Sequence, residues 1–377
     1  MKLANQIRTT SAALLLCFAA TNAFAQASYE RILNSADEPE NWLTYNGGYK
    51  SQRYSQLDQI TPENVTDLKL QWTLQNQVFG AWQSNPIVVD GIMYVTERPN
   101  TVMAVDAITG RVFWKYRHVP AENALICCGA NNRGVAVLDD KVFMGTLDAR
   151  LVALDRVTGS ALWDVEVGDV DLAYSVTMAP LVVKDKVIVG VGGGEFGIRG
   201  YVAAYDAETG EEAWKTYTIP GPGEPNHDSW QGDDWEHGGA PVWITGSFDP
   251  ELNLTYWGVG NPGPDWNAGQ RPGDNLYSDS VIALDADSGE LKWYFQFTPN
   301  DAYDYDSVQV PVLADIVWRG TPSKVMMWAN RNGYFYVLDR VTGKFLEGKP
   351  YVKVNWSSGL DDNGRPIPTP QPEGMPT

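Results

Sequence analysis

Residues 104–114 read Ala104-Val-Asp-Ala-Ile-Thr-Gly-Arg-Val-Phe-Trp114, and this pattern recurs along the chain. In each copy an apolar strand is expected to end at the Asp, whose carboxylate can cap the backbone amides that follow. Thr or Ser and then Gly form a hairpin turn in which Gly takes a positive φ, and the next strand ends at Trp. Further copies begin at Ala153, Ala204 and Ala283, and a fifth, Val337-Leu-Asp-Arg-Val-Thr-Gly-Lys-Phe-Leu, has lost its Trp.

A second apolar strand pair precedes most copies, as in residues 84–95, 135–144 and 180–190. Each repeat therefore holds about four antiparallel strands, with a usual period of about 50 residues. Four strands per unit at this period predict an all-β fold, a β-propeller of four-stranded blades in which one Trp per blade docks against the neighbouring sheet. About five such blades are expected here, and a stacked β-sandwich is the alternative.

The first residues have the features of a secretory signal. Lys2 and Arg8 precede the apolar run 12–20, and Ala23-Phe-Ala25 is a small-x-small cleavage site. We therefore expect an exported, periplasmic protein, with no later apolar stretch near the roughly 20 residues that span a bilayer. The expected divisions are a signal peptide at residues 1–25 and a partial propeller domain at residues 26–377.

The chain is acidic, with 47 Asp and Glu against 28 Lys and Arg and a formal net charge of −19. Loss of the signal peptide would take this charge to about −21. Such a surface repels nucleic acid and anionic membranes, and it attracts basic partner proteins.

Three segments outside the repeats have distinct expectations. Thr61 and Pro62 suit the N-cap and first position of a short helix, which leads into a strand at residues 68–72 with its own Trp. Residues 219–240, rich in Pro, Gly, Asp and Trp, are expected to form an ordered loop. An arc of five blades would leave two bare sheet edges, so the Pro-rich end at residues 366–377 indicates a truncated sequence.

Candidate metal-binding side chains lie outside the repeat turns. Asp301, Asp304 and Asp306 stand at i, i+3 and i+5 among aromatic residues. On an extended backbone Asp304 and Asp306 would point to the same side and could share one cation, although a solvated acidic loop is the alternative. Glu195 after three glycines and Asn261 in Gly-Asn-Pro complete an all-oxygen set that suits Ca²⁺ or a trivalent ion rather than zinc.

Cys127 and Cys128 are adjacent and precede Gly-Ala-Asn-Asn-Arg133-Gly. In an exported protein two such thiols are expected to oxidise, which closes an eight-membered ring and strains the peptide between them. Strain of that kind tends to accompany function. Two unrelated buried thiols are the alternative, and a zinc site is disfavoured because the chain has no CxxC pair and only three histidines.

Together these motifs resemble a known family. The sequence is similar to the quinoprotein alcohol dehydrogenases, which depend on pyrroloquinoline quinone (PQQ). The similarity is carried by Cys-Cys with Asn-Arg-Gly, Gly-Gly-Glu-Phe-Gly-Ile-Arg-Gly, Gly-Asn-Pro-Gly-Pro with Arg-Pro-Gly-Asp-Asn-Leu-Tyr-Ser, Asp304-Tyr-Asp306 and Asn330-Arg-Asn-Gly-Tyr-Phe-Tyr-Val-Leu-Asp-Arg. The similarity runs from about residue 40 to the end. Periplasmic members of the family, such as methanol and ethanol dehydrogenases, form an eight-bladed propeller, which implies that later blades are missing here.

The resemblance implies a role for each matching residue. The Cys127–Cys128 disulfide would pack on one face of the quinone and Trp243 would stack on the other. The quinone carboxylates and carbonyls would be bound by Arg133, Thr177, Gly192, Gly193 and Gly194. The metal would be ligated by Glu195, Asn261, Asp304 and Asp306. Asp304 also matches the catalytic base, and Arg331 matches the cation beside the quinone oxygens.

The resemblance also bears on the metal and the substrate. Asp306 matches the extra carboxylate of the lanthanide-using branch, whereas calcium-using members carry a small or uncharged residue there. One more negative ligand favours a trivalent ion, so a lanthanide is preferred over Ca²⁺. Methanol specificity is left open by departures from the family at Gln83, Pro241, Tyr303 and Gly192.

The implied activity is the oxidation of primary alcohols to aldehydes by metal-assisted hydride transfer, with Asp304 as the base. Electrons would pass to a separate cytochrome c, because this chain has no CxxCH haem motif. A homodimer is one assembly that we consider. One alternative is a non-enzymatic PQQ-repeat propeller scaffold of the outer-membrane assembly type, which has no use for paired cysteines beside a ligand set. Another is a PQQ enzyme acting on sugars, which typically lacks the adjacent cysteines.

Overall fold

A computed structural model describes residues 26–370 of the protein. The predicted signal peptide lies outside the described residues. Within them the chain is almost entirely β-structure, with one short α-helix, α1 (Tyr29–Leu33), and several single turns of 3₁₀-helix. No helix in the described part is long and apolar enough to cross a membrane. The all-β prediction is confirmed.

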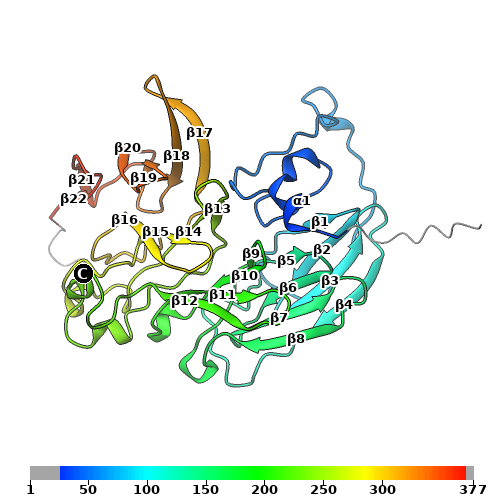
Figure 1. The fold of residues 1–377 in the computed structure, drawn as a ribbon, viewed down its shortest axis with the longest axis horizontal. Coiled ribbons are helices and arrows are strands. Elements are labelled where there is room, and N and C mark those ends of the chain that lie inside the picture. The colour runs from blue at the N-terminus through cyan, green and yellow to red at the C-terminus, as the bar shows by residue number, and fades with distance from the viewer. Residues whose placement is uncertain (1–25, 371–377) are drawn as a thin grey trace, which may run out of the picture.

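Five sheets of four antiparallel strands form the body of the molecule, each with its strands in sequential order (Figure 1). The first three sheets comprise β1 (Ile87–Val89), β2 (Ile92–Glu97), β3 (Thr101–Asp106) and β4 (Val112–Arg117); β5 (Ala136–Leu138), β6 (Lys141–Gly145), β7 (Arg150–Asp155) and β8 (Ala161–Glu166); and β9 (Leu181–Val183), β10 (Lys186–Gly190), β11 (Tyr201–Asp206) and β12 (Glu212–Tyr217). The last two comprise β13 (Ser247–Asp249), β14 (Leu254–Gly258), β15 (Ser280–Asp285) and β16 (Leu291–Gln296); and β17 (Val312–Trp318), β18 (Thr321–Ala329), β19 (Tyr334–Asp339) and β20 (Phe345–Pro350). A two-stranded sheet of β21 (Ser357–Leu360) and β22 (Pro366–Pro368) follows.

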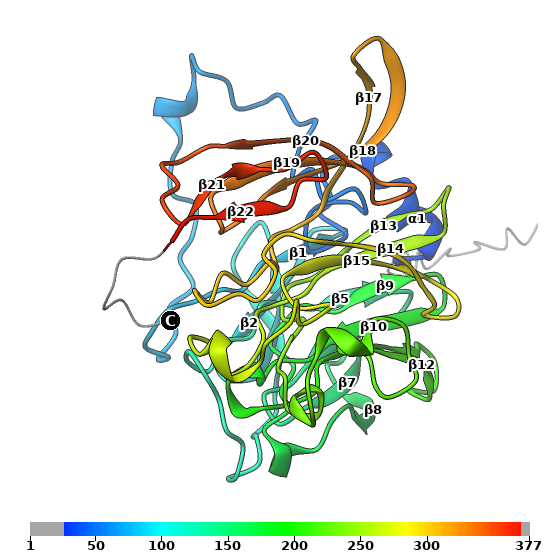
Figure 2. The same cartoon turned by 90° about the vertical axis from the view of Figure 1, so that its left-hand side faces the viewer.

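The sheets are stacked face to face as propeller blades. Figure 2 shows the sheets after the first in succession, from β7 and β8 low in the view, through β9–β12 and β13–β15, to β18–β20 near the top. Inner strands are therefore covered on both faces: every residue of β6 is buried, as are five of the six residues of β3. The outermost strand β4 instead alternates between exposed and partly covered residues. Burial on both faces explains why the inner strands read as continuous apolar runs.

The repeat turns have the predicted geometry. In the first copy Asp106 Oδ1 accepts hydrogen bonds from the backbone N–H groups of Ile108 (2.8 Å) and Thr109 (3.0 Å). Gly110 follows with φ +75°. The Asp residues of the other four copies bond the corresponding amides in the same way.

The repeat tryptophans dock one blade against the next, as predicted. The ring of Trp114, at the end of the first blade, lies against Gly159 in the turn of the second, and its Nε1 donates to the carbonyl oxygen of Arg156 (3.0 Å). Trp163 and Trp214 make the same contact with the turns of the following blades. Glycine is required at this position because a Cβ on Gly159 would come within 2.5 Å of the indole ring.

This docking gives a testable expectation for stability. Gly159→Ala should lower the free energy of unfolding by about 2–5 kcal/mol, because the positive φ costs about 1–2 kcal/mol and overpacking about 1–3 more. Gly91→Ala is the matched control: Gly91 has φ +76°, but no atom lies within 4 Å of an added Cβ. Urea denaturation of both variants measures the difference. Equal losses would show that the Trp114 contact contributes nothing.

Outside the repeats two predictions need correction, and one is confirmed. The helix expected at Thr61 is only a 3₁₀ turn at Val65–Asp67. Residues 68–72 do not form a strand, because no neighbouring strand among the described residues pairs with them, and Leu70 is 85% exposed. Trp72 nevertheless docks on the first repeat turn, donating to Ala107 O (3.1 Å). The segment 219–240 is ordered as predicted, with 3₁₀ turns at His227–Ser229 and Asp234–Glu236.

Candidate active site

A pocket of about 580 Å³ opens at one end of the stacked sheets. Its walls come from the segment before β1 and from the connections β4–β5, β8–β9, β10–β11, β12–β13, β14–β15, β16–β17 and β18–β19, so all five four-stranded sheets contribute. Ligand pockets commonly measure about 300–1,000 Å³. The lining includes Tyr45, Gln83, Ile126, Cys127, Cys128, Asn131, Arg133, Ser175, Thr177, Gly192, Gly193, Glu195, Pro241, Trp243, Asp265, Trp266, Asp304, Asp306 and Arg331.

The structure brings the predicted site residues together. All of them line this pocket except Gly194 and Asn261. Gly194 begins the 3₁₀ turn Gly194–Phe196, which carries Glu195. Asn261 is buried directly behind the wall, where its backbone N–H donates to Asp306 Oδ1 (3.3 Å). Segments more than 150 residues apart in the sequence thus converge on one cavity.

One part of the wall consists of a disulfide, an indole and a guanidinium group. Cys127 and Cys128 are bonded to each other, as predicted. The Arg133 guanidinium lies 4.6 Å from the centre of the Trp243 ring, and its Nη1 donates to Thr177 Oγ1 (2.7 Å). Trp243 Nε1 donates to Asp306 Oδ1 (3.2 Å), which fixes the plane of the indole. These groups offer flat apolar surface and anion-binding donors side by side.

The glycine-rich loop gives the backbone close access to this wall. Gly192 pairs with Ser175 through two backbone hydrogen bonds, from Gly192 N (2.8 Å) and from Ser175 N (3.2 Å). Gly193 has φ +114°, and a Cβ there would overlap the carbonyl oxygen of Ala173. Only glycine fits at Gly193, which explains why the loop before Glu195 is built from glycines.

Asp304 and Asp306 both face the pocket, but not for the predicted reason. Their backbones are left-handed, with φ +61° and +47°, rather than extended. The third carboxylate of the stretch, Asp301, turns inward instead. It accepts the N–H groups of Tyr303 (2.9 Å) and Tyr305 (2.8 Å), and so it holds the loop in shape. The stretch therefore has two pocket carboxylates and one structural carboxylate.

The pocket holds more negative than positive charge. Four carboxylates line it, against the guanidinium groups of Arg133 and Arg331. Burial and the neighbouring Asp304 charge raise the pKa of Asp306 to about 7, despite its hydrogen bond from Trp243 and the nearby Arg331. Burial also raises the pKa of Glu195 and of Asp304, and the Asp265 charge adds to both shifts. Arg331 bridges the pair, 3.7 Å from Asp304 Oδ2 and 3.3 Å from Asp306 Oδ2.

Carboxylates crowded in this way suit a bound cation. Carboxylates that repel one another in a buried site are stabilised in the charged form by a metal ion among them. Glu195 also has an oxygen within 4.8 Å of both cysteine sulfurs. Since the sulfurs are joined in a disulfide, they are not thiolate ligands, and the oxygen-rich side of the pocket is the place that fits a hard ion.

Several lining residues were not among the predicted site residues. Asp265, Asn131, Ser175, Tyr45 and Trp266 all reach the pocket. Asp265 and Trp266 stand in the Gly-Asn-Pro-Gly-Pro-Asp-Trp motif itself, four and five residues after Asn261. Their closeness in sequence to Asn261, a predicted ligand, could have indicated that they line the pocket. Spacing in an irregular loop, however, does not say which side chains point inward.

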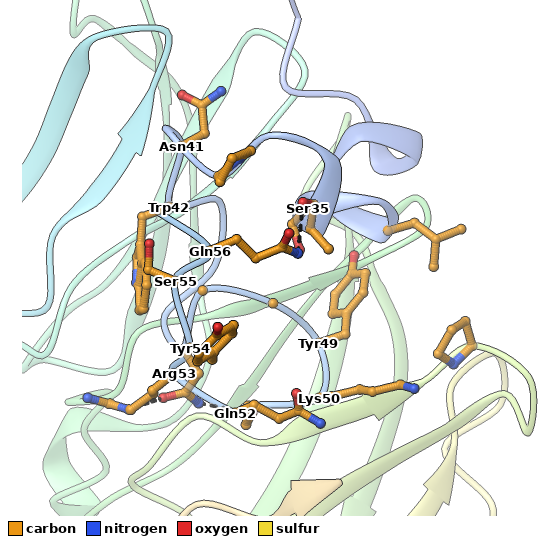
Figure 3. A pocket seen from close by; sticks show the side chains of 18 residues that line it. Ser35, Asn41, Trp42, Tyr49, Lys50, Gln52, Arg53, Tyr54, Ser55 and Gln56 are labelled. Carbon is orange, nitrogen blue, oxygen red and sulfur yellow. Dashed lines mark hydrogen bonds between the residues drawn. The ribbon is translucent and has the colours of Figure 1, made fainter. Parts of the chain in front are cut away.

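A second pocket, of about 320 Å³, lies in the N-terminal segment between Leu33 and Gln56, closed by Pro250. Figure 3 shows its side chains, among them Trp42, Tyr49, Lys50 and Arg53. Its lining contains no carboxylate, thiol or imidazole. Because it lacks the carboxylates and the disulfide of the predicted motifs, which line the 580 Å³ pocket, the latter is the candidate active site.

Comparison with known proteins identifies the family. The family model labelled PQQ and described as "Glucose/ethanol/alcohol dehydrogenase, beta-propeller domain" matches residues 42–362. The chain belongs to the PQQ-dependent alcohol dehydrogenases. The sequence is 44% identical to quinohemoprotein alcohol dehydrogenase ADH-IIG of Pseudomonas putida, over 96% of this chain and 53% of that protein.

Two further relatives are named for a lanthanide. The chain is 39% identical to the lanthanide-dependent methanol dehydrogenase of Methylacidiphilum fumariolicum strain SolV, over 96% of this chain and 63% of that protein. A solved structure of a europium-containing methanol dehydrogenase superposes with a TM-score of 0.86 at 39% identity, covering 90% of this chain and 63% of the other. The chain thus spans between about half and two thirds of the length of these relatives.

Proposed function

We propose that this chain forms the catalytic pocket of a periplasmic dehydrogenase that uses PQQ and one metal ion to oxidise primary alcohols to aldehydes. The observation that carries the proposal is the convergence of Glu195, Asp304 and Asp306 with the Cys127–Cys128 disulfide and Trp243 in one cavity. Family membership supports it, because the relatives are named quinoprotein or quinohemoprotein alcohol dehydrogenases. Neither a scaffold nor a sugar-oxidising enzyme explains this combination as directly.

The residues present fit both groups. The disulfide and the Trp243 ring supply flat surfaces for a planar quinone, while Arg133 and Thr177 supply donors for its carboxylates. Glu195, Asn261, Asp304 and Asp306 would hold the ion through oxygen atoms. Asp306 adds a negative charge that favours a trivalent lanthanide over Ca²⁺, because the Coulomb attraction grows with ion charge.

When bound, the quinone supplies the hydride acceptor and the metal ion supplies Lewis acidity. The chain supplies proton transfer and orientation. Asp304 takes the proton from the substrate hydroxyl, a role that its raised pKa suits because a base works best with a pKa nearer to neutrality. Arg331 lies between Asp304 and Asp306, and its positive charge would stabilise negative charge on the acceptor. Electrons then leave to a cytochrome c, for which the acidic surface is suited.

Reconstitution tests this function. The chain should be incubated with PQQ and either La³⁺ or Ca²⁺, scanned for quinone absorbance, and assayed for dye reduction with ethanol. We expect a bound-quinone band and turnover that requires both groups, with La³⁺ more effective than Ca²⁺. Absence of the band and of turnover with either ion would instead favour a non-enzymatic propeller scaffold.

A further inference from the structure

Asp265 is a pocket carboxylate to which no role has yet been given. It lies in the β14–β15 connection and lines the candidate active site. Its Oδ1 accepts a hydrogen bond from Asn261 Nδ2 at 2.8 Å. Asn261 is buried, with 6% of its surface exposed, and Asp265 is half-buried, so the contact is partly shielded from solvent.

The contact determines which way the Asn261 amide faces. An ionised carboxylate only accepts hydrogen bonds, so the NH₂ group must point to Asp265 and the carbonyl oxygen must point away from it. The backbone N–H of the same residue donates to Asp306 Oδ1 (3.3 Å). Asn261 is therefore held between two carboxylates. Its side-chain carbonyl oxygen, the one acceptor of that side chain, makes no hydrogen bond to Asp265.

A buried guanidinium group fixes the loop that carries Asp265. Arg271 is 1% exposed, and its Nη2 donates to the carbonyl oxygens of Pro264 and Asp265, both at 3.4 Å. The same Nη2 also donates to the carbonyl oxygen of Asp301, at the start of the loop that carries Asp304. Arg271 thus ties the Asn261–Asp265 loop to the loop of the pocket carboxylates.

We propose that Asp265 is a positioning residue for the metal site. It turns the Asn261 carbonyl oxygen towards the ion, and it contributes a negative charge just outside the ligand set that favours a trivalent ion. Hydrogen-bond partners behind a ligand orient it and make it a stronger donor to the metal. This inference rests on the proposed function, because it requires an ion held by Asn261.

Two substitutions separate orientation from charge. Asp265→Asn can still accept the Asn261 hydrogen bond through its own Oδ1 but removes the charge, whereas Asp265→Ala removes both. We expect Asp265→Ala to weaken binding of both La³⁺ and Ca²⁺ by about 10–100-fold, as loss of such a partner commonly does. Asp265→Asn should weaken La³⁺ binding by about tenfold and Ca²⁺ binding by about threefold or less, since a trivalent ion depends more on charge.

The measurement is isothermal titration calorimetry of each ion into the PQQ-reconstituted full chain, with melting temperatures recorded in parallel. Asp228→Asn is the charge-matched control, because Asp228 is exposed and does not line the pocket. If the Asp265 variants bind both ions as tightly as the wild type, the role of Asp265 is wrong but the proposed function still stands. An equal loss in Asp228→Asn would also overturn it, by showing an effect of overall charge. A wild-type chain that binds neither ion would overturn the proposed function as well.

Discussion

Asp304→Asn is expected to lower kcat for alcohol oxidation by about 10²–10⁴-fold, the usual contribution of a positioned general base. An amide cannot take the hydroxyl proton, although its oxygen can still approach the metal. Asp304 is the best placed carboxylate for this role, because it faces the pocket beside Arg331 and its pKa is raised by burial. Steady-state assays with ethanol on the reconstituted enzyme measure the effect.

The Asp304 result needs evidence that the cofactor and the ion remain bound. Quinone absorbance and metal content should stay close to the wild-type values, and KM should change less than kcat. Asp228→Asn, which removes a charge outside the pocket, should keep full activity. A variant that retained both groups and a kcat within about threefold of the wild type would show that another group removes the proton.

Asp306→Asn is expected to reverse the preference for La³⁺ over Ca²⁺. The substitution removes one negative charge but leaves an oxygen that can accept from Trp243 Nε1, which now lies 3.2 Å from Asp306 Oδ1. Because a trivalent ion loses more Coulomb energy than a divalent one, kcat/KM with La³⁺ should fall at least about tenfold while activity with Ca²⁺ persists. If La³⁺ activity survived unchanged and Ca²⁺ activity fell, the metal assignment of Asp306 would be wrong.

The stability of Asp306→Asn without metal can be compared with that of the wild type as a control. The pKa of Asp306 is about 7 in the folded chain, against about 3.9 expected when unfolded. The folded state therefore binds a proton on Asp306 more tightly than the unfolded state does. The stability that this protonation contributes is fully present below pH 4 and is lost as the pH rises from about 4 to about 7. Metal-free Asp306→Asn should melt above the wild type at pH 8 and close to it at pH 4. Thermal scans at the two pH values test this sign.

The repeat shows how local chemistry makes a fold predictable. Asp106, Thr109 and Gly110 specify their turn through hydrogen bonds and a φ value that involve only neighbouring residues. The turn therefore forms in the same way in every copy, and the blades could be read from the sequence. Residues 68–72 failed as a strand because a strand also needs a neighbour, which the local pattern does not supply.

The candidate site was predictable in its members but not in its geometry. The motifs named the groups that meet in the pocket, because each motif combines unusual residue types. The sequence did not show that Asp301 turns inward to cap Tyr303 and Tyr305, while Asp304 faces the pocket with a left-handed backbone. The sequence placed Asp265 four residues after Asn261, but it did not show that the two side chains meet.

The amino-acid sequence by itself determined the blades, their turns and the docking tryptophans, because these depend on contacts within one repeat or between successive repeats. Only the tertiary structure decided which loop side chains face the pocket. That choice depends on how seven irregular connections pack at one end of the sheets and on buried groups such as Arg271, which joins two of those loops. The contact between Arg271 and Asp301 joins residues 30 positions apart in the chain, so no local pattern encodes it.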